Sequence, residues 1–430
     1  MPSSDPRLSQ PTRRRLLQTT AGLTGLAVLG NSASLPVAAD PGTEQWAFDT
    51  GGGSRSSPTV VDGTVYVGSA NDRLYAVDAT TGEQEWAFET PGWKAVKSSP
   101  TVVDGTVFVG CDDNHLYSVD AATGEEQWAF ETGDRVSSSP TVVDGTVFVG
   151  SYDDNLYAID AATGEEEWVF ETGDWIQSSP TVVDETVFIG GRDNHLHAVD
   201  AATGEQEWVF ETGDSAPSSP TVAAGTVFVG SSDNNLYAVD ATTGEEQWVF
   251  ETEDSVISSP TVMDGTVFVG SSDNNLYAVD AEAGEQEWAF KTGETVYSSP
   301  TVADGTVFVG SWDNNLYAVD AATGEEEWAF ETGSLIFASP TVVDGTVYVG
   351  SYDDNLYALD AGVESSSEGS RVQLGTLGHH GEWRYADQSI PVTEESERSE
   401  SVPGFGVGSG ITALGATGYM LKRRLQNDSA

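Results

Sequence analysis

The 430-residue chain has few residues that could form covalent or metal cross-links. It contains one cysteine, Cys111, together with five histidines and three methionines. A lone cysteine cannot form an intramolecular disulfide, so a folded domain must be stabilised by packing or by closure of a sheet. No zinc-binding spacing and no cysteine-nucleophile motif is present. These absences exclude disulfide-rich modules and sites built on cysteine pairs.

Basic residues are equally scarce. The chain has 17 lysines and arginines against 69 acidic residues, a net charge of -52. So strong a negative field repels nucleic acid and anionic lipid, which excludes a nucleic-acid partner. The 38% hydrophobic content and 12 tryptophans also exclude a disordered acidic chain. The composition is therefore that of a folded protein with an acidic coat, as is typical of proteins from salt-loving microbes.

The centre of the chain lacks long hydrophobic runs and consists instead of a short repeat. Each repeat contains four segments, PTVV, TVFVG, NLYAVD and EEWAFET, in which β-branched and aromatic residues alternate. Four strands in a period of 40 residues predict a propeller blade. The sequence therefore predicts an all-β, eight-bladed β-propeller of four-stranded antiparallel blades. One proline marks each repeat: Pro58, Pro100, Pro140, Pro180, Pro220, Pro260, Pro300 and Pro340.

The sequence also predicts the turns of each repeat and the way in which the ends of the repeat array meet. Asp-Gly pairs such as Asp144 and Gly145 predict two-residue hairpins, and Glu185 replaces the glycine in the fourth repeat. The last repeat supplies only three strand types, whereas 44–50 is a lone strand of the fourth type. We expect this N-terminal strand to complete the eighth blade and close the ring. A strand around Trp383 is the alternative.

One motif in each repeat resembles a known family. The pattern A-x-D-x-x-T-G-x-x-x-W, seen from Ala158 to Trp168, resembles the tryptophan-docking repeat of the pyrroloquinoline-quinone-like (PQQ-like) repeat family, which includes the quinoprotein alcohol dehydrogenases. The resemblance covers roughly residues 44–360. It implies that each tryptophan packs between neighbouring blades as a structural residue. The tryptophans are Trp46, Trp86, Trp128, Trp168, Trp208, Trp248, Trp288 and Trp328.

Both ends of the chain resemble targeting segments. TRRRLLQ at 12–18, followed by an apolar stretch, resembles a twin-arginine signal and predicts a signal peptide over 1–39. Pro403, Gly404 and Phe405 begin a tail over 402–430 that resembles the haloarchaeal PGF sorting signal, preceded by an acidic Ser/Gly-rich stalk at 362–401. These resemblances imply export by the twin-arginine translocase and processing by archaeosortase, with lipid replacing the tail. The alternative is a marginal transmembrane anchor, and both place the propeller, 40–361, outside the cell on its surface.

Variation between repeats predicts a binding face. In a four-stranded meander, the loop leading into the first strand and the turn between the second and third strands share one face. Residues that differ between repeats gather there, including six of the seven basic residues between Glu44 and Asp360; Lys291 is expected elsewhere. Drift at unconstrained loop positions is the alternative explanation. The candidate residues are Arg55, Trp93, Lys94, Lys97, Arg135, Tyr152, Trp175, Arg192, Tyr297, Trp312, Phe337 and Tyr352.

The residues favour a scaffold over an enzyme. The family's dehydrogenases need Ca²⁺ beside the quinone, a catalytic aspartate and, in many members, a cysteine pair. This chain has one cysteine, no inserted loop longer than two residues, and His115, His195 and His197 at positions that suggest ordinary substitution. We therefore predict no catalytic, cofactor-binding or metal-binding residues. The closer resemblance is to the propeller-only members of the family, which hold partner proteins.

The predicted function is a non-enzymatic scaffold on the cell surface whose partner is an unidentified surface protein, peptide or glycan. Two alternatives remain open at this point. The first is a quinoprotein dehydrogenase that uses PQQ and Ca²⁺. The second is a carbohydrate-binding or adhesive propeller.

Overall fold

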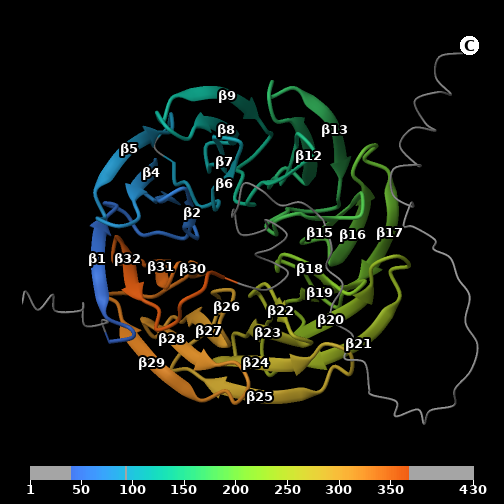
Figure 1. Cartoon of the computed structure of the whole chain (residues 1–430). Helices are drawn as coiled ribbons and strands as arrows, with labels where there is room; N and C mark the ends of the chain where they lie inside the picture. The colour runs from blue at the N-terminus through green and yellow to red at the C-terminus, as the bar shows by residue number, and fades with distance from the viewer. Residues whose placement is uncertain (1–39, 93, 368–430) are drawn as a thin grey trace, which may run out of the picture. The chain divides into compact units, whose positions relative to one another are not determined.

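A computed structural model describes residues 40–92 and 94–367 of the chain. Within these ranges every regular element is a β-strand, and the strands form eight four-stranded antiparallel sheets. The sheets are arranged as blades around a ring (Figure 1). The same ranges contain no helix that could span a membrane. The prediction of an all-β, eight-bladed propeller is confirmed.

The first four blades follow one another along the chain, each with its first strand nearest the ring axis (Figure 1). Blade 1 comprises β2 (Thr59–Val61), β3 (Thr64–Gly68), β4 (Arg73–Asp78) and β5 (Gln84–Glu89). Blade 2 comprises β6 (Thr101–Val103), β7 (Thr106–Gly110), β8 (His115–Asp120) and β9 (Glu126–Glu131). Blade 3 comprises β10 (Thr141–Val143), β11 (Thr146–Gly150), β12 (Asn155–Asp160) and β13 (Glu166–Glu171). Blade 4 comprises β14 (Thr181–Val183), β15 (Thr186–Gly190), β16 (His195–Asp200) and β17 (Gln206–Glu211).

The next three blades repeat this plan, and the eighth joins both ends of the repeat array. Blade 5 comprises β18 (Thr221–Ala223), β19 (Thr226–Gly230), β20 (Asn235–Asp240) and β21 (Glu246–Glu251). Blade 6 comprises β22 (Thr261–Met263), β23 (Thr266–Gly270), β24 (Asn275–Asp280) and β25 (Gln286–Lys291). Blade 7 comprises β26 (Thr301–Ala303), β27 (Thr306–Gly310), β28 (Asn315–Asp320) and β29 (Glu326–Glu331). Blade 8 comprises β30 (Thr341–Val343), β31 (Thr346–Gly350), β32 (Asn355–Asp360) and β1 (Glu44–Asp49).

The N-terminal strand closes the ring, as predicted. β1 pairs antiparallel with β32, with Ala47 opposite Tyr357 and Phe48 opposite Leu356. It fills the outer position of blade 8, for which a strand near Trp383, outside the described residues, was the alternative. Closure removes the free edges between the first and last blades, where an open array would expose unpaired backbone groups.

The hydrophobic core lies between blades rather than within one sheet. One cluster, for example, joins Phe108 and Leu116 of blade 2 to Val147, Val149 and Ile159 of blade 3. Comparable clusters join the other neighbouring pairs of blades. A single blade therefore cannot bury its own apolar surface and depends on both neighbours.

Each tryptophan covers the glycine-containing turn between the third and fourth strands of the next blade. The Trp128 indole N–H donates to the Ala161 carbonyl at 3.1 Å. A Cβ atom added to Gly164 would lie 2.7 Å from the Trp128 ring, and Gly164 has a φ of +72°. Glycine is therefore required twice, for the left-handed backbone and for the close approach of the indole. All eight tryptophans make the equivalent bond at 2.9–3.4 Å.

Two rings of hydrogen bonds close around the axis. In the serine ring, each backbone N–H donates to the serine hydroxyl of the next blade at 2.9–3.0 Å, and Ser339 returns to Ser57. In the threonine ring, the hydroxyl that follows each repeat proline donates to the proline carbonyl of the next blade, and Thr341 returns to Pro58. Each ring has eight members and no end, so every blade is fixed to both neighbours at the axis.

The Asp-Gly hairpins have the backbone that the sequence predicts. Asp144 and Gly145 both have positive φ, 50° and 86°, as a type I′ turn requires. Blade 4 keeps the same turn with Glu185 at a φ of 69°. A non-glycine residue in the left-handed region carries a steric cost of about 1–2 kcal/mol, so this turn is strained.

Replacement of Glu185 by glycine should therefore stabilise the protein. We expect the free energy of unfolding to rise by about 0.5–1 kcal/mol in E185G, because relief of the left-handed strain exceeds the entropic cost of glycine. Denaturant unfolding followed by tryptophan fluorescence measures this. The reciprocal G145E variant should lose a similar amount, since a Cβ atom at Gly145 meets nothing within 4 Å and only its φ matters. A destabilised E185G protein would contradict this account.

The threonine ring can be tested with an isosteric change. Thr221 is fully buried, and its hydroxyl donates to the Pro260 carbonyl at 2.6 Å. T221V keeps the volume but removes the donor, so we expect a loss of about 1–3 kcal/mol in the free energy of unfolding. T226V is the matched control, because Thr226 makes an exposed bond to Gln247 and should cost less than about 0.5 kcal/mol. Equal losses in the two variants would show that the buried threonine bond adds no more stability than an exposed one.

Candidate binding face

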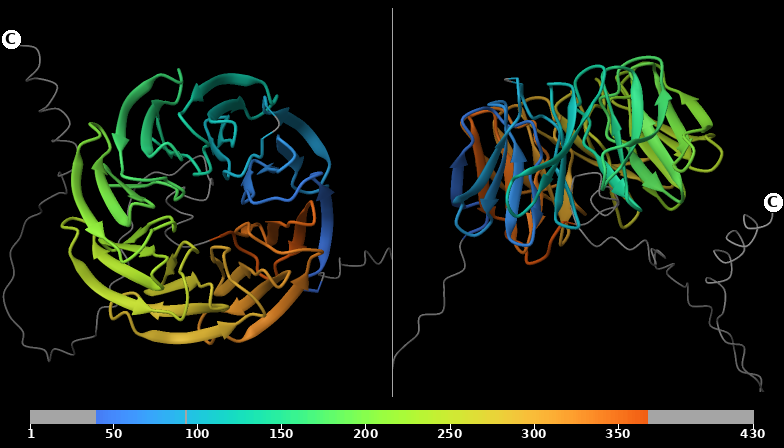
Figure 2. Two further views of the ribbon diagram at one scale, coloured as in Figure 1. Left: turned by 180° about the vertical axis from the view of Figure 1, so that it is seen from behind. Right: turned by 90° about the horizontal axis from the view of Figure 1, so that it is seen from above.

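The strands run between the two faces of the ring, so loops and turns gather on those faces (Figure 2). Backbone hydrogen bonds join the lead-in loop of each blade to the turn between its second and third strands. Tyr152 N–H donates to the Arg135 carbonyl, and Arg192 N–H donates to the Trp175 carbonyl, both at 3.0 Å. We call the face that carries these loops and turns the binding face.

The strand register places Lys291 at this end of the molecule too. Lys291 lies opposite Asn275, the first residue of β24 after the turn on the binding face. The expectation that Lys291 lies elsewhere is wrong, because the fourth strand of a meander ends where the third begins. All seven basic residues of the described propeller therefore lie towards one face. In blade 1, Arg73 occupies the position of Asn275 and pairs with Glu89, which occupies that of Lys291, at 3.0 Å.

Four of the predicted residues form a stacked group across blades 3 and 4, which we call the Arg135 cluster. The Tyr152 and Trp175 rings stack with centroids 5.1 Å apart. The Arg135 guanidinium lies 4.5 Å from the Tyr152 centroid, and Arg192 lies 5.3 Å from that of Trp175. Trp175 is 38% exposed, so it offers an aromatic surface to a partner. Burial raises the pKa of Tyr152 more than the charge of Arg135 lowers it, which keeps the phenol neutral.

Five more predicted residues form a second group, the Phe337 cluster: Arg55, Tyr297, Trp312, Phe337 and Tyr352. Tyr297 and Trp312 stack with centroids 4.6 Å apart, and Phe337 lies within 5.5 Å of both. The Arg55 guanidinium lies 4.4 Å from the Phe337 centroid, and its Nε donates to the Tyr352 hydroxyl. Contacts of a cation with an aromatic face contribute about 0.5–2 kcal/mol each. The cluster therefore holds its arginine in place before any ligand binds.

An axial cavity of about 290 Å³ lies between the two clusters. Arg55, Lys97 and Arg135 line it together with Gln177, and no aspartate or glutamate is among its lining residues. Lys97 forms an ion pair with Asp112, which leaves the two arginines as the unneutralised cations. A cavity lined by cations without carboxylates is unusual in a chain whose net charge is -52. The remaining lining residues are Ser57, Ser99, Ser137, Ser139, Tyr152, Ser179, Pro217, Ser219, Ile257, Tyr297, Ser299, Phe337 and Ser339.

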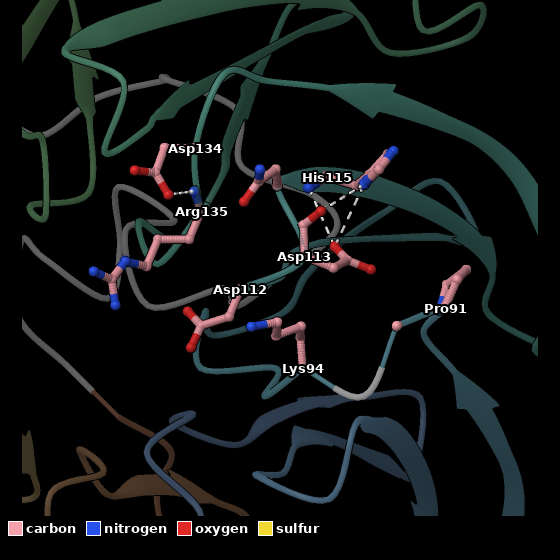
Figure 3. Close-up of a pocket in the computed structure, with 9 residues that line it drawn as sticks. Pro91, Lys94, Asp112, Asp113, His115, Asp134 and Arg135 are labelled. Atoms are coloured by element: carbon pink, nitrogen blue, oxygen red, sulfur yellow. Dashed lines mark hydrogen bonds and ion pairs between the residues drawn. The ribbon is translucent and has the colours of Figure 1, made fainter.

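A larger pocket of about 650 Å³ lies between blades 2 and 3 (Figure 3). Lys94 and Arg135 supply its cations, and Asp112, Asp113 and Asp134 supply carboxylates. Its three carboxylates distinguish it from the axial cavity, whose lining has none. Among the predicted residues, Lys94 lines this pocket and belongs to neither cluster.

Trp93 and the predicted sorting residues Pro403, Gly404 and Phe405 lie outside the described residues.

Two features of the site were not predicted from the sequence. Spacing alone did not show that the histidines of blade 4 meet an aspartate: Asp193 Oδ2 lies 2.9 Å from His197 Nε2 and 3.5 Å from His195 Nδ1. Burial raises the pKa of Asp193, but the hydrogen bond and charge of His197 outweigh it and hold that pKa below its usual value. Cys111 is buried, and burial raises the pKa of its thiol to about 12, which keeps it unreactive.

Comparison with known families finds two propeller models. The family model described as outer membrane protein assembly factor BamB matches residues 35–137 and 291–403, together just over half of the chain. A second model, described as the β-propeller of β-alanine-activating enzyme, matches residues 96–307. Among curated proteins, the outer membrane protein assembly factor BamB of Alkalilimnicola ehrlichii is 39% identical over 87 residues. That match covers 18% of this chain and 23% of the relative, so it spans about a quarter of the relative's length.

Solved structures share the fold at low sequence identity. BamB from Moraxella catarrhalis matches with a TM-score of 0.65 and 19% identity, over 74% of this chain and 99% of that one. The computationally designed Ika8 protein matches with a TM-score of 0.66 and 17% identity, over 74% and 100% of the two chains. Quinohemoprotein alcohol dehydrogenase from Comamonas testosteroni matches with a TM-score of 0.62 and 18% identity, over 75% and 77%. Identities this low show the fold alone.

Proposed function

Because the chain belongs to the PQQ-like repeat propeller family, whose model carries the description outer membrane protein assembly factor BamB, we propose that it is a non-enzymatic scaffold that binds a partner protein. The axial cavity is the observation that carries the proposal. Arg55 and Arg135 are held there by aromatic rings, and no carboxylate lines the cavity. Arginine and aromatic side chains are the usual anchors of protein interfaces.

The chemistry of the cavity favours a carboxylate-bearing segment of the partner. The acidic coat repels such a segment at long range, but the screening length falls to about 3 Å in molar salt. Only short-range contacts then decide binding. Paired arginine N–H groups and the serine hydroxyls of the lining can donate to a carboxylate, while Trp175 and Tyr152 pack against its neighbours.

A quinone-dependent reaction does not fit the residues of the cavity. Ca²⁺ takes oxygen ligands, usually with carboxylates among them, and the axial cavity has none in its lining. The lone thiol of Cys111 cannot supply a vicinal cysteine pair. A general base is also missing from the lining, since neither an aspartate nor a histidine faces the cavity. The donor set supports binding of an anion better than redox chemistry with PQQ and Ca²⁺.

We place this scaffold on the cell surface. The proposal rests on the twin-arginine-like segment within 1–39 and the PGF-type tail within 402–430, both outside the described residues. Archaeosortase processing would replace the tail with lipid and leave the stalk, 362–401, as a tether. The matching family model and the curated relative are both described as outer membrane protein assembly factors, which supports a position of this chain outside the cytoplasm.

Substitution of the Arg135 cluster should weaken partner binding. We expect the affinity of R135A/W175A for the partner to be at least about 10-fold lower than that of the unchanged protein. Interface anchors contribute about 2 kcal/mol or more each to binding. The immobilised full chain is exposed to envelope proteins of the source cells in strong salt, and retained proteins are quantified by mass spectrometry. The purified partner is then titrated by calorimetry against both proteins.

K291A is the matched control, because Lys291 lies at the same end of the molecule on an outer strand. It should bind the partner like the unchanged protein. The scaffold proposal would be contradicted if no protein were found that binds K291A better than R135A/W175A. Stoichiometric binding of PQQ with Ca²⁺ would contradict its non-enzymatic part, and affinity for surface glycans alone would favour the adhesive alternative.

A further inference from the structure

A repeated tyrosine–aspartate pair stabilises the turn between the second and third strands of most blades. The tyrosine hydroxyl donates to a carboxylate oxygen of the aspartate four residues earlier, at 2.6–2.8 Å. The other carboxylate oxygen accepts the backbone N–H at the start of the third strand. Six blades share this pair, with Tyr117, Tyr157, Tyr237, Tyr277, Tyr317 and Tyr357 as donors.

Blade 4 replaces this arrangement with two imidazoles. His197 takes the place of the tyrosine and His195 the place of the asparagine found in most other blades. Residues two apart on a strand project to the same side, so both rings of β16 face Asp193 in the preceding turn. Asp193 Oδ1 accepts the His195 backbone N–H at 3.2 Å, which leaves Oδ2 to face the imidazoles.

The three side chains lie at distances suited to a metal ion. Asp193 Oδ2 is 2.9 Å from His197 Nε2 and 3.5 Å from His195 Nδ1, and one ligand atom from each residue lies within 4.8 Å of the others. Tetrahedral coordination with bonds of 2.0–2.2 Å separates ligand atoms by about 3.3 Å. Only small movements would bring the three atoms around one ion.

Burial leaves polar nitrogen atoms of these histidines without partners. His197 is 5% exposed, and Phe170 packs edge-on against its ring at 5.5 Å. Among the described residues, four buried side-chain nitrogen or oxygen atoms make no hydrogen bond, and two of them are the Nδ1 atoms of His195 and His197. Such atoms carry a desolvation cost. His195 Nδ1 faces the Asp193 carboxylate, and a bound cation would satisfy it.

Blade 2 provides an internal contrast. His115 occupies the same turn position as His195, but its neighbour on the strand is Tyr117, which donates to Asp113. His115 Nδ1 lies 3.0 Å from the Asp113 backbone carbonyl and so has a partner. One histidine at this position is thus accommodated by ordinary turn chemistry. Only the second histidine creates three convergent ligands.

We propose that Asp193, His195 and His197 form a binding site for one divalent transition metal ion, with Zn²⁺ as the best fit. Two imidazoles and one carboxylate suit Zn²⁺, Cu²⁺ or Ni²⁺ better than Ca²⁺ or Mg²⁺, which prefer oxygen ligands. The three residues supply three ligand atoms, which leaves the fourth position of a tetrahedral site to a water molecule. The metal site itself does not depend on the proposed scaffold function.

The test is metal titration of the full chain without a histidine tag. H379A/H380A serves as the reference protein, because His379 and His380 are the chain's other neighbouring histidines. The protein is stripped with chelator and titrated with Zn²⁺ by calorimetry, then loaded with Cu²⁺ for electron paramagnetic resonance. We expect one Zn²⁺ per chain and hyperfine coupling of Cu²⁺ to two nitrogen nuclei.

H197Y in the reference background is the decisive variant. It recreates the Asp-His-Tyr set of blade 2, so it should fold, and its thermal unfolding midpoint verifies this. We expect its Zn²⁺ affinity to fall more than about 100-fold, since even outer-shell partners of metal ligands contribute 10–100-fold. H115N, at the equivalent position of blade 2, should leave binding unchanged. Absence of binding by the reference protein, or equal binding by folded H197Y, would overturn the proposal.

Discussion

The structure depends on contact between neighbouring blades. The apolar clusters lie between sheets, the indole of one blade covers a glycine turn of the next, and the serine and threonine rings pass from blade to blade without an end. No blade contains a complete hydrophobic core of its own. Stability is therefore a property of the closed ring, and the pairing of β1 with β32 is the step that makes the ring closed.

This dependence explains how much of the fold could be predicted. The motif A-x-D-x-x-T-G-x-x-x-W contains both halves of one contact, since its tryptophan docks on the glycine of the next copy of the motif. A contact repeated at a fixed period is visible in sequence, as were the hairpins and the closing strand. The repeat period could not show one contact at the closure of the ring. Trp328 contacts both Ala361 and Gly42, because the motif of blade 8 is divided between the two ends of the array.

The site was predictable only in part. Residues that differ between repeats pointed to one face, and the structure brings most of them into two clusters around the axial cavity. Which residues touch could not be predicted, because Arg55 meets Phe337 across the boundary between the first and last blades. Lys291 was misplaced because strand direction was not followed to the end of the fourth strand. The contact of the blade 4 histidines with Asp193 could not be predicted, because an aspartate stands at this turn position in most blades.

The position of β1 has a consequence for synthesis of the chain. β1 leaves the ribosome first among the strands, yet its partner β32 emerges about 300 residues later. At about 5–20 residues per second, this wait lasts on the order of tens of seconds. Throughout that time the blades already made have an open edge, and each third strand offers β1 nearly the same sequence. A nascent ring must therefore avoid pairing β1 with the wrong third strand or with another chain, and the order of translation becomes part of how eight similar blades assemble into one ring.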